Sequence, residues 1–328
     1  MPKTNDGGGD IFDRSFKQII GSLSDGALIS FINSLFDAGH PVESPVVRLN
    51  TEQIGKNLEK QQPDEIVSIE GKIYIIEEQT APDKNMAIRV FEYGYAQSLK
   101  DKSIKDGMVI LPFPRMIVIY LEAGSITPDI LKIRLEFPDG TEHDFKVKTL
   151  KLLDYGVEEL AGKGFTPLLP FYIIKLRKEA KRAKTEEERR RVEEAFKELG
   201  LKLAKTIEES APEWLLDEAD ITTLLERLSG MVEYVGRGYR TTEVKKMINT
   251  SLMGYGKVLL LEGEKKGRKK GRKEGEKKGE KKGEKKGRKE GKLEILNLLK
   301  AGCSTEALKE RLEAELVSAA SKPRTISN

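Results

Sequence analysis

The sequence predicts an α/β core, with a mixed sheet flanked by helices, followed by a helical C-terminal region and a charged tail with periodic glycines. Two observations predict the core: apolar residues recur at helical spacing near the N-terminus, and short β-prone segments bounded by turn residues follow them. Charged helical periodicity then replaces this pattern. The expected segments are a core at 10–175, a helical region at 176–262, a basic arm at 263–292 and short helices at 293–318.

Composition narrows the classes of function. No apolar run approaches the roughly 18 residues of a membrane span, and the first ten residues lack the basic-then-apolar pattern of a secretory signal. We therefore expect a cytoplasmic protein that does not insert in membranes. The single cysteine, Cys303, cannot form an intramolecular disulfide, and the two histidines, His40 and His143, are too few for an ordinary zinc site. Catalysis would depend on carboxylates, amides, Lys and Arg, which suit hard cations such as Mg²⁺.

The core elements can be placed from periodicity and turn residues. Two helices are expected in residues 10–39, with Ser24 or Asp25 capping the second and Gly39 ending it. Besides the hairpin discussed next, the core should contain a helix at 85–100 and strands at 116–121, 133–137 and 144–153. In the helical region, Thr185 and Glu188 form a capping box for a helix reaching about residue 209, with further helices at 217–233 and 241–252.

A β-hairpin is predicted where Glu65–Ile69 and Ile73–Gln79 flank a Glu-Gly-Lys sequence. If Glu70-Gly71 forms a two-residue turn, Asp64 falls directly opposite Glu77. Facing residues of antiparallel strands point to the same side, with Cβ atoms about 4.5–5.5 Å apart. A three-residue turn would shift the register by one and place Asp64 opposite Glu78 instead. The two-residue turn predicts one face with Gln62, Asp64, Ile66, Glu77 and Gln79, and another with Glu65, Tyr74 and Glu78.

Two carboxylates and an amide would thus meet at one end of the hairpin. Like charges placed opposite each other are unfavourable unless a cation lies between them. Metal-assisted phosphodiester hydrolysis uses such a group, because carboxylates hold a cation that polarises the phosphoryl oxygen and activates water. Asp64 and Glu77 are the candidate metal ligands, and Gln79 is the candidate for orienting the water. The alternative is coincidence, since 54 of the 328 residues are acidic and neighbouring Glu78 could take the same role.

Pro63-Asp64 followed by Glu77-Glu78-Gln79 looks like the PD-(D/E)XK nuclease signature, with Gln79 at the position of the usual lysine. Together with the motifs that flank it, this signature resembles the recombination-promoting nuclease/putative transposase family (Rpn type). The other motifs that carry the resemblance are Asp13-Arg-Ser-Phe16-Lys17, the IYIIEEQ strand, Arg89-Val-Phe-Glu-Tyr93, Phe137-Pro-Asp-Gly140, Leu168-Leu-Pro-Phe-Tyr172 and the Gly-Lys-Glu tail. The resemblance covers about residues 10–300. It implies a restriction-endonuclease-like core and metal-dependent DNA cleavage.

Carried over by position, the resemblance makes Asp64 and Glu77 the ligands of Mg²⁺ or Mn²⁺ and Gln79 the third catalytic residue. A neutral amide can orient water, but it cannot neutralise developing charge as an ammonium group would. Four accessory residues are candidates to approach this site: Asp13, Lys17, Arg89 and Tyr93. The first two could equally be ordinary polar residues of a solvated helix, and the last two could serve packing.

Glycine recurs at every fourth position from 263 to 291, separated only by Lys, Arg and Glu. The segment 263–292 holds 16 basic and 6 acidic residues, a net charge of +10 against +4 for the whole chain. Eight glycines would each cost a helix roughly 0.8–1 kcal/mol, while favourable charge pairs return only about 0.2–0.5 kcal/mol each. We therefore expect a solvated arm or a marginal helix, which either binds phosphate backbones without reading sequence or acts as a spacer.

Three functional hypotheses follow. The first is a Mg²⁺-dependent DNA endonuclease linked to recombination or a mobile element. The second is a DNA-binding or assembly protein that keeps the fold after losing efficient chemistry. The third is a helical interaction protein whose hairpin carboxylates are incidental. The first two have DNA as the partner, none involves a membrane, and all are compatible with a homo-oligomer.

Overall fold

A computed structural model of the chain describes residues 8–49, 53–54, 60–61, 63–251, 300, 304 and 309–310. The expected basic arm at 263–292, Cys303 and most of the expected helices at 293–318 lie outside the described residues. The described residues up to 251 belong to one compact unit.

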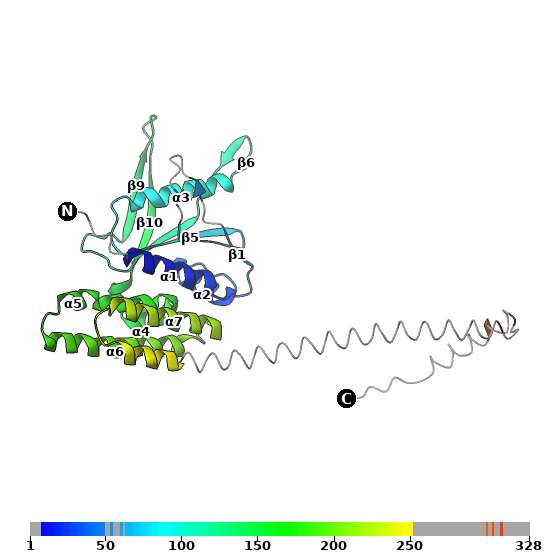
Figure 1. Ribbon diagram of the computed structural model, residues 1–328. Helices are drawn as coiled ribbons and strands as arrows, with labels where there is room; N and C mark the ends of the chain where they lie inside the picture. The colour runs from blue at the N-terminus through cyan, green and yellow to red at the C-terminus, as the bar shows by residue number, and fades with distance from the viewer. Residues whose placement is uncertain are drawn as a thin grey trace. The chain divides into compact units, whose positions relative to one another are not determined.

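The core is α/β, as predicted, and its centre is a mixed sheet of six strands (Figure 1). In spatial order the strands are β1 (Val46–Arg48), β4 (Glu65–Ile69), β5 (Lys72–Gln79), β8 (Arg115–Tyr120), β10 (Glu142–Lys151) and β9 (Ile130–Glu136). The pairs β5–β8 and β8–β10 are parallel, and the remaining neighbours are antiparallel. Strand β8 is almost wholly buried, which is why its sequence is a continuous apolar run.

Two small antiparallel ladders were not expected from the sequence. Strand β2 (Gln53–Ile54) pairs with β3 (Lys60–Gln61), and β6 (Ser103–Lys105) pairs with β7 (Met108–Ile110). The second hairpin leaves three large apolar side chains mostly exposed: Ile104, Met108 and Val109. Each strand is two or three residues long, too short for alternation of polar and apolar residues to distinguish it from a loop.

Helices cover both faces of the sheet. One face packs on α1 (Gly8–Ser22) and α2 (Asp25–Phe36), and its cluster includes Val67, Tyr74 and Ile76. The other face packs on α3 (Met86–Lys100), together with Ile66 and Ile75. This alternation along β4 and β5 decides which side chains point toward which helix.

The N-terminal helices confirm one expected cap and correct the other. The hydroxyl of Ser24 caps α2 by accepting the backbone N–H of Ala27. The helix ends at Phe36, and Asp37, rather than Gly39, takes the left-handed conformation with φ of 51° at its C-terminus. Asp tolerates this conformation better than most residues, so the helix ends before the glycine is reached.

The β4–β5 hairpin has the register expected for a two-residue turn. Ile69 pairs with Lys72 and Glu65 pairs with Ile76. Both turn residues have positive φ, 51° at Glu70 and 77° at Gly71, as a primed hairpin turn requires. The register therefore confirms the prediction and excludes the three-residue turn.

The C-terminal helices share a core with the sheet. They comprise α4 (Val157–Gly162), the 3₁₀ segment η2 (Thr166–Leu176), α5 (Arg177–Arg182), α6 (Glu186–Ser210), α7 (Glu218–Val235) and a helix at 242–251, with a short 3₁₀ turn η1 (Leu152–Asp154) leading into them. The Thr185–Glu188 capping box of α6 is present. Apolar residues of η2, α6 and α7 join the same cluster as α1 and the sheet, so this region packs directly on the core.

No single helix among the described residues is long and apolar enough to cross a membrane. Helices α1 and α2 are together long and apolar enough for a span, but they are bent by 116° relative to one another. Their apolar side chains fill the core described above.

Candidate active site

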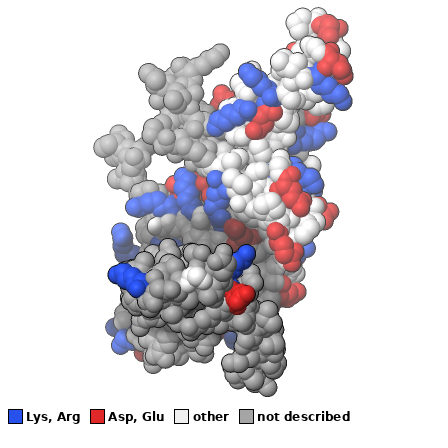
Figure 2. Space-filling model, turned by 90° about the vertical axis from the view of Figure 1, so that its right-hand side faces the viewer, with Lys and Arg blue, Asp and Glu red and all other residues white. Residues whose placement is uncertain are grey.

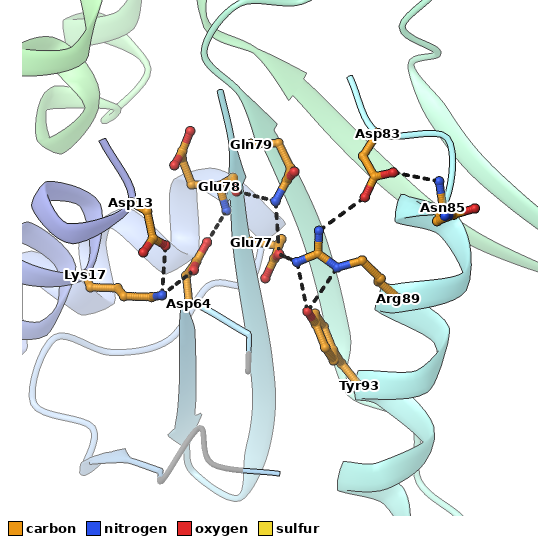
Figure 3. Close-up of polar contacts among 10 residues, drawn as sticks. All are labelled: Asp13, Lys17, Asp64, Glu77, Glu78, Gln79, Asp83, Asn85, Arg89 and Tyr93. Carbon is orange, nitrogen blue, oxygen red and sulfur yellow. Dashed lines mark hydrogen bonds and ion pairs between the residues drawn. The ribbon is translucent and has the colours of Figure 1, made fainter. Parts of the chain in front are cut away.

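The candidate residues gather where β4 begins and β5 ends, between α1 and α3 (Figure 3). Asp64 immediately precedes β4, and Glu77 and Gln79 lie in the last three residues of β5. The carboxylates of Asp64, Glu77 and Glu78 belong to residues that are 6%, 1% and 4% exposed. Charged side chains are rarely buried to this extent without partners, so the contacts of each carboxylate determine what the site can do.

Asp64 lies between the two faces of the sheet. One carboxylate oxygen, Oδ2, accepts the backbone N–H of Glu78 at 2.6 Å. Because backbone N–H groups lie in the plane of the sheet, this bond holds the carboxylate at the end of the β4–β5 ladder. The other oxygen, Oδ1, lies 3.1 Å from Nζ of Lys17, which also lies 2.8 Å from Asp13. Alternation alone predicts that Asp64 points to the same face as Glu77. Its carboxylate is instead linked to Lys17 of α1 and to the backbone of β5.

Glu77 points to the face covered by α3. Its Oε1 accepts hydrogen bonds from Nη2 of Arg89 at 2.6 Å and from Nε2 of Gln79 at 3.1 Å. The contact with Gln79 confirms that residues two apart on β5 share a face. The second oxygen, Oε2, is buried and has no hydrogen-bond partner among the described residues. An unpartnered buried carboxylate oxygen is costly unless a ligand or water satisfies it.

Arg89 and Tyr93 form the α3 side of the site. The hydroxyl of Tyr93 accepts hydrogen bonds from Nη2 and Nε of Arg89 at 3.0 and 3.3 Å. Asp83 accepts from Nη1 of the same guanidinium at 3.3 Å. These contacts hold the guanidinium against Glu77, so Arg89 and Tyr93 act beyond packing. Asp83 could not be predicted from the sequence, because a spacing of six residues across a loop and a helix start has no characteristic pattern.

Glu78 points away from Arg89. Its Oε1 accepts a hydrogen bond from the hydroxyl of Thr80 at 3.3 Å, and its backbone N–H is the donor to Asp64. Burial raises the pKa of Glu78 to about 8, with a further contribution from the charge of Asp64. Glu65, at the start of β4, has its pKa raised to about 7 by burial, against the opposing effect of Arg48. The buried acidic character therefore extends beyond the two residues chosen from the sequence.

The electrostatics of the central pair show how incompletely its charge is balanced. Burial raises the pKa of Asp64, and a hydrogen bond with Asp13 adds to the effect. Burial also raises the pKa of Glu77, and the charge of Asp64 raises it further, whereas the charge of Arg89 acts in the opposite direction. Bonds to Asp13 and Asp64 raise the pKa of Lys17 despite its partial burial, so its ammonium group stays charged. Burial is thus the largest cause of the two raised carboxyl pKa values, and the neighbouring acidic groups add to it.

Four carboxylates, those of Asp13, Asp64, Glu77 and Asp83, thus pair with the two cations Lys17 and Arg89, and the carboxyl group of Glu78 is buried close by without an ion pair among the described residues. This donor set fits a hard divalent cation, because carboxylate oxygens are its preferred protein ligands. The unpartnered Oε2 of Glu77 is the atom best placed to accept one. No group of three or more His, Cys, Asp or Glu residues in the described part of the chain is arranged to hold a metal ion. Magnesium is commonly held by one or two carboxylates, completed by water and phosphate oxygens.

The structure brings all seven residues predicted from the sequence into one network: Asp13, Lys17, Asp64, Glu77, Gln79, Arg89 and Tyr93. Gln62, which was expected on the same face, lies outside the described residues. Comparison of the chain with family models, with curated proteins and with solved structures found no match. The α/β architecture and the buried carboxylates are therefore the observations from which a function can be inferred.

Proposed function

We propose that the protein is a Mg²⁺-dependent DNA endonuclease with a restriction-endonuclease-like core, linked to DNA recombination or a mobile element. One observation carries the proposal: Glu77 is buried beside Asp64, and its Oε2 has no hydrogen-bond partner among the described residues. Two buried acids held together without enough positive charge are destabilising, and a divalent cation offsets that cost. The mixed sheet with helices on both faces is compatible with such a core.

Each residue of the network has a role in this proposal. Asp64 and Glu77 would hold Mg²⁺, or Mn²⁺, which supplies Lewis-acid activation of the phosphodiester and of the attacking water. Gln79 donates to Glu77 and to the backbone carbonyl of Glu78 through the same nitrogen, so its amide plane is held in place. A fixed amide can orient water through its carbonyl oxygen. Lys17 keeps a positive charge beside Asp64, where it can contact a substrate phosphate.

A second candidate function is a DNA-binding or assembly protein without efficient chemistry. The observation that favours it is the 2.6 Å contact of Arg89 with Glu77, because the guanidinium already binds the carboxylate that is proposed to bind the metal. The neutral Gln79 supports it too, since no ammonium group lies at that position. In this case Asp64 and Glu77 would be structural, and divalent cations would leave the protein unchanged.

Plasmid DNA incubated with the purified full-length chain, with and without Mg²⁺, tests the proposal. Nicking or linearisation should require the metal and should be lost in Asp64→Asn and in Glu77→Gln, both of which keep the side-chain shape. Glu209→Gln, an exposed carboxylate on α6, is the matched control and should cleave as wild type. Circular dichroism of each variant verifies that the fold is kept. Equal cleavage by wild type and Asp64→Asn would refute the proposal, and metal-independent DNA binding without cleavage would favour the second candidate.

A further inference from the structure

A second group of basic residues lies outside the candidate active site, between α5 and α7. A pocket of about 200 Å³ there is lined by Arg177, Lys181 and Arg237, and by the phenol rings of Tyr234 and Tyr239. No acidic side chain is among its lining residues. Tyr239 donates its hydroxyl hydrogen to the carbonyl of Ala180, which ties the loop after α7 to α5. The pocket is thus built from two elements that are about 60 residues apart in the sequence.

Helix α5 is strongly basic. Its six residues, RKEAKR, contain four cations and one carboxylate. Among the described residues, Lys178, Arg182 and Arg237 have no carboxylate within ion-pair distance. Over the described part of the face in Figure 2, by contrast, both basic and acidic side chains occur. Of the three cations without such a carboxylate, Arg237 lines the pocket, and an exposed cation beside a concave site attracts anions.

The pocket is connected to the candidate active site by two series of contacts. In the first, Nη1 of Arg177 lies 3.2 Å from Glu122, whose backbone N–H donates to the carbonyl of Thr80. The hydroxyl of Thr80 in turn bonds to Glu78. Arg177 therefore lies at the same end of the sheet as the buried carboxylates, where both β5 and β8 end.

The second series of contacts runs through α1. The guanidinium of Arg177 lies over the ring of Phe12, 5.9 Å from its centroid, and Tyr234 packs edge-on against the same ring at 5.7 Å. Phe12 is followed directly by Asp13, which is paired with Lys17 in the candidate site. Helix α1 thus packs against two residues that line the pocket and also carries Asp13 and Lys17 of the carboxylate network. Figure 1 shows α5 on the same side as the N-terminal end of α1.

We propose that this pocket holds a backbone phosphate of the DNA that the candidate active site acts on, an inference that rests on the proposed function. Arginine binds phosphate oxygens through two parallel N–H groups, and lysine adds a charged donor. Arg237 is exposed and so can move to meet the ligand, whereas Arg177 is held by Glu122. None of these contacts reads a base, so the pocket would position a strand without selecting its sequence. The substrate would therefore be a polynucleotide long enough to reach both sites.

Binding of a short fluorescein-labelled DNA duplex by the full-length chain, measured by anisotropy in buffer without divalent cations, tests the inference. Wild type, Arg237→Gln and Lys181→Gln are compared across a salt series from about 50 to 200 mM. Each variant should bind roughly threefold to tenfold more weakly, and the slope of log K against log salt should fall by about 0.9 for each lost contact. Arg237→Lys should keep most of the slope, because it retains the charge.

The matched control is Lys205→Gln, which removes an exposed cation near the C-terminal end of α6. It should bind DNA as wild type, and equal affinities and slopes for Arg237→Gln and this control would overturn the proposal. Inorganic phosphate distinguishes the source of the anion. If it raises the melting temperature of wild type but not of Arg237→Gln, while both bind DNA equally, the pocket serves free phosphate and the proposal is wrong.

The two proposals can fail separately. Because binding is measured without a divalent cation, the result does not depend on cleavage. DNA binding that requires Arg237, without Mg²⁺-dependent cleavage, would keep the pocket and reject the endonuclease. Cleavage that requires Asp64, with unaltered DNA binding by Arg237→Gln, would do the reverse.

Discussion

Arg89 and Glu77 join the two layers of the candidate site, with Nη2 of the guanidinium 2.6 Å from Oε1 of the carboxylate. The guanidinium is about one third exposed, whereas the carboxylate is buried. The same nitrogen bonds to Tyr93, and Nη1 reaches Asp83, so three groups fix its position. Glu77 therefore has one oxygen that is firmly bound and one that lacks a partner among the described residues.

Replacing Arg89 by alanine should destabilise the protein, because the buried Glu77 would lose its cation. A fully buried pair that loses one partner costs about 3–5 kcal/mol, and partial exposure of Arg89 reduces this to roughly 1–3 kcal/mol. Millimolar Mg²⁺ or Mn²⁺ should restore part of the loss. Urea unfolding with and without the metal measures both effects. Arg134→Ala, which breaks two exposed ion pairs between β9 and β10, should cost less than about 1 kcal/mol and show no metal dependence.

Gln79 can be separated from the metal ligands by its kinetics. In Gln79→Ala, the donor to Glu77 and the carbonyl that could orient water are both lost. We expect kcat for DNA cleavage to fall about 10-fold to 1000-fold, while the Mg²⁺ concentration for half-maximal activity changes little. Gln79→Lys should retain cleavage, since an ammonium group can also donate to Glu77. A Gln79→Ala variant with unchanged kcat would remove this residue from the site.

The hairpin turn provides a pH-dependent contribution to stability that is independent of the candidate site. His40 and Ser44 both hydrogen-bond to the carboxylate of Glu70, which lowers its pKa from 4.5. A lowered carboxyl pKa stabilises the folded state above the unfolded value, and this contribution is lost as pH falls through the folded value. Glu70→Gln should therefore be less stable than wild type near neutral pH, and the difference should shrink below about pH 4.5. A difference in unfolding free energy that is constant across this range would contradict the assignment.

Gly164, in the turn between α4 and η2, tests how closely this turn packs against α2 and against Trp214 after α6. Its φ is 79°, and a Cβ atom would overlap the hydroxyl of Ser34 and lie 2.9 Å from the Trp214 ring. Left-handed backbone costs a non-glycine residue about 1–2 kcal/mol, and overpacking costs about 1–3 kcal/mol. Gly164→Ala should thus lower the unfolding free energy by about 2–5 kcal/mol. Gly162→Ala, two residues earlier in α4 with open space around it, should be neutral or slightly stabilising.

Much of the core was predictable from local patterns. The β4–β5 register follows from a two-residue turn with glycine at its second position, because the length of the turn decides which residues of the two strands pair. The capping box at Thr185 and Glu188 is likewise local, because both bonds form within one helical turn. The short β6–β7 hairpin could not be predicted, since its exposed residues show no alternation of burial.

The sequence by itself determined which residues stand opposite one another within the hairpin, because that relationship depends on turn length and on a period of two along each strand. Only the tertiary structure decided that Asp64 lies beside Lys17 of α1, that Arg89 approaches Glu77 from α3, and that Arg177 and Arg237 line one pocket. These residues are separated by many positions, and their distances depend on how helices pack against the two faces of the sheet. No local periodicity encodes that packing. The charged residues of the site could therefore be identified from the sequence, but which carboxylate pairs with which cation could not.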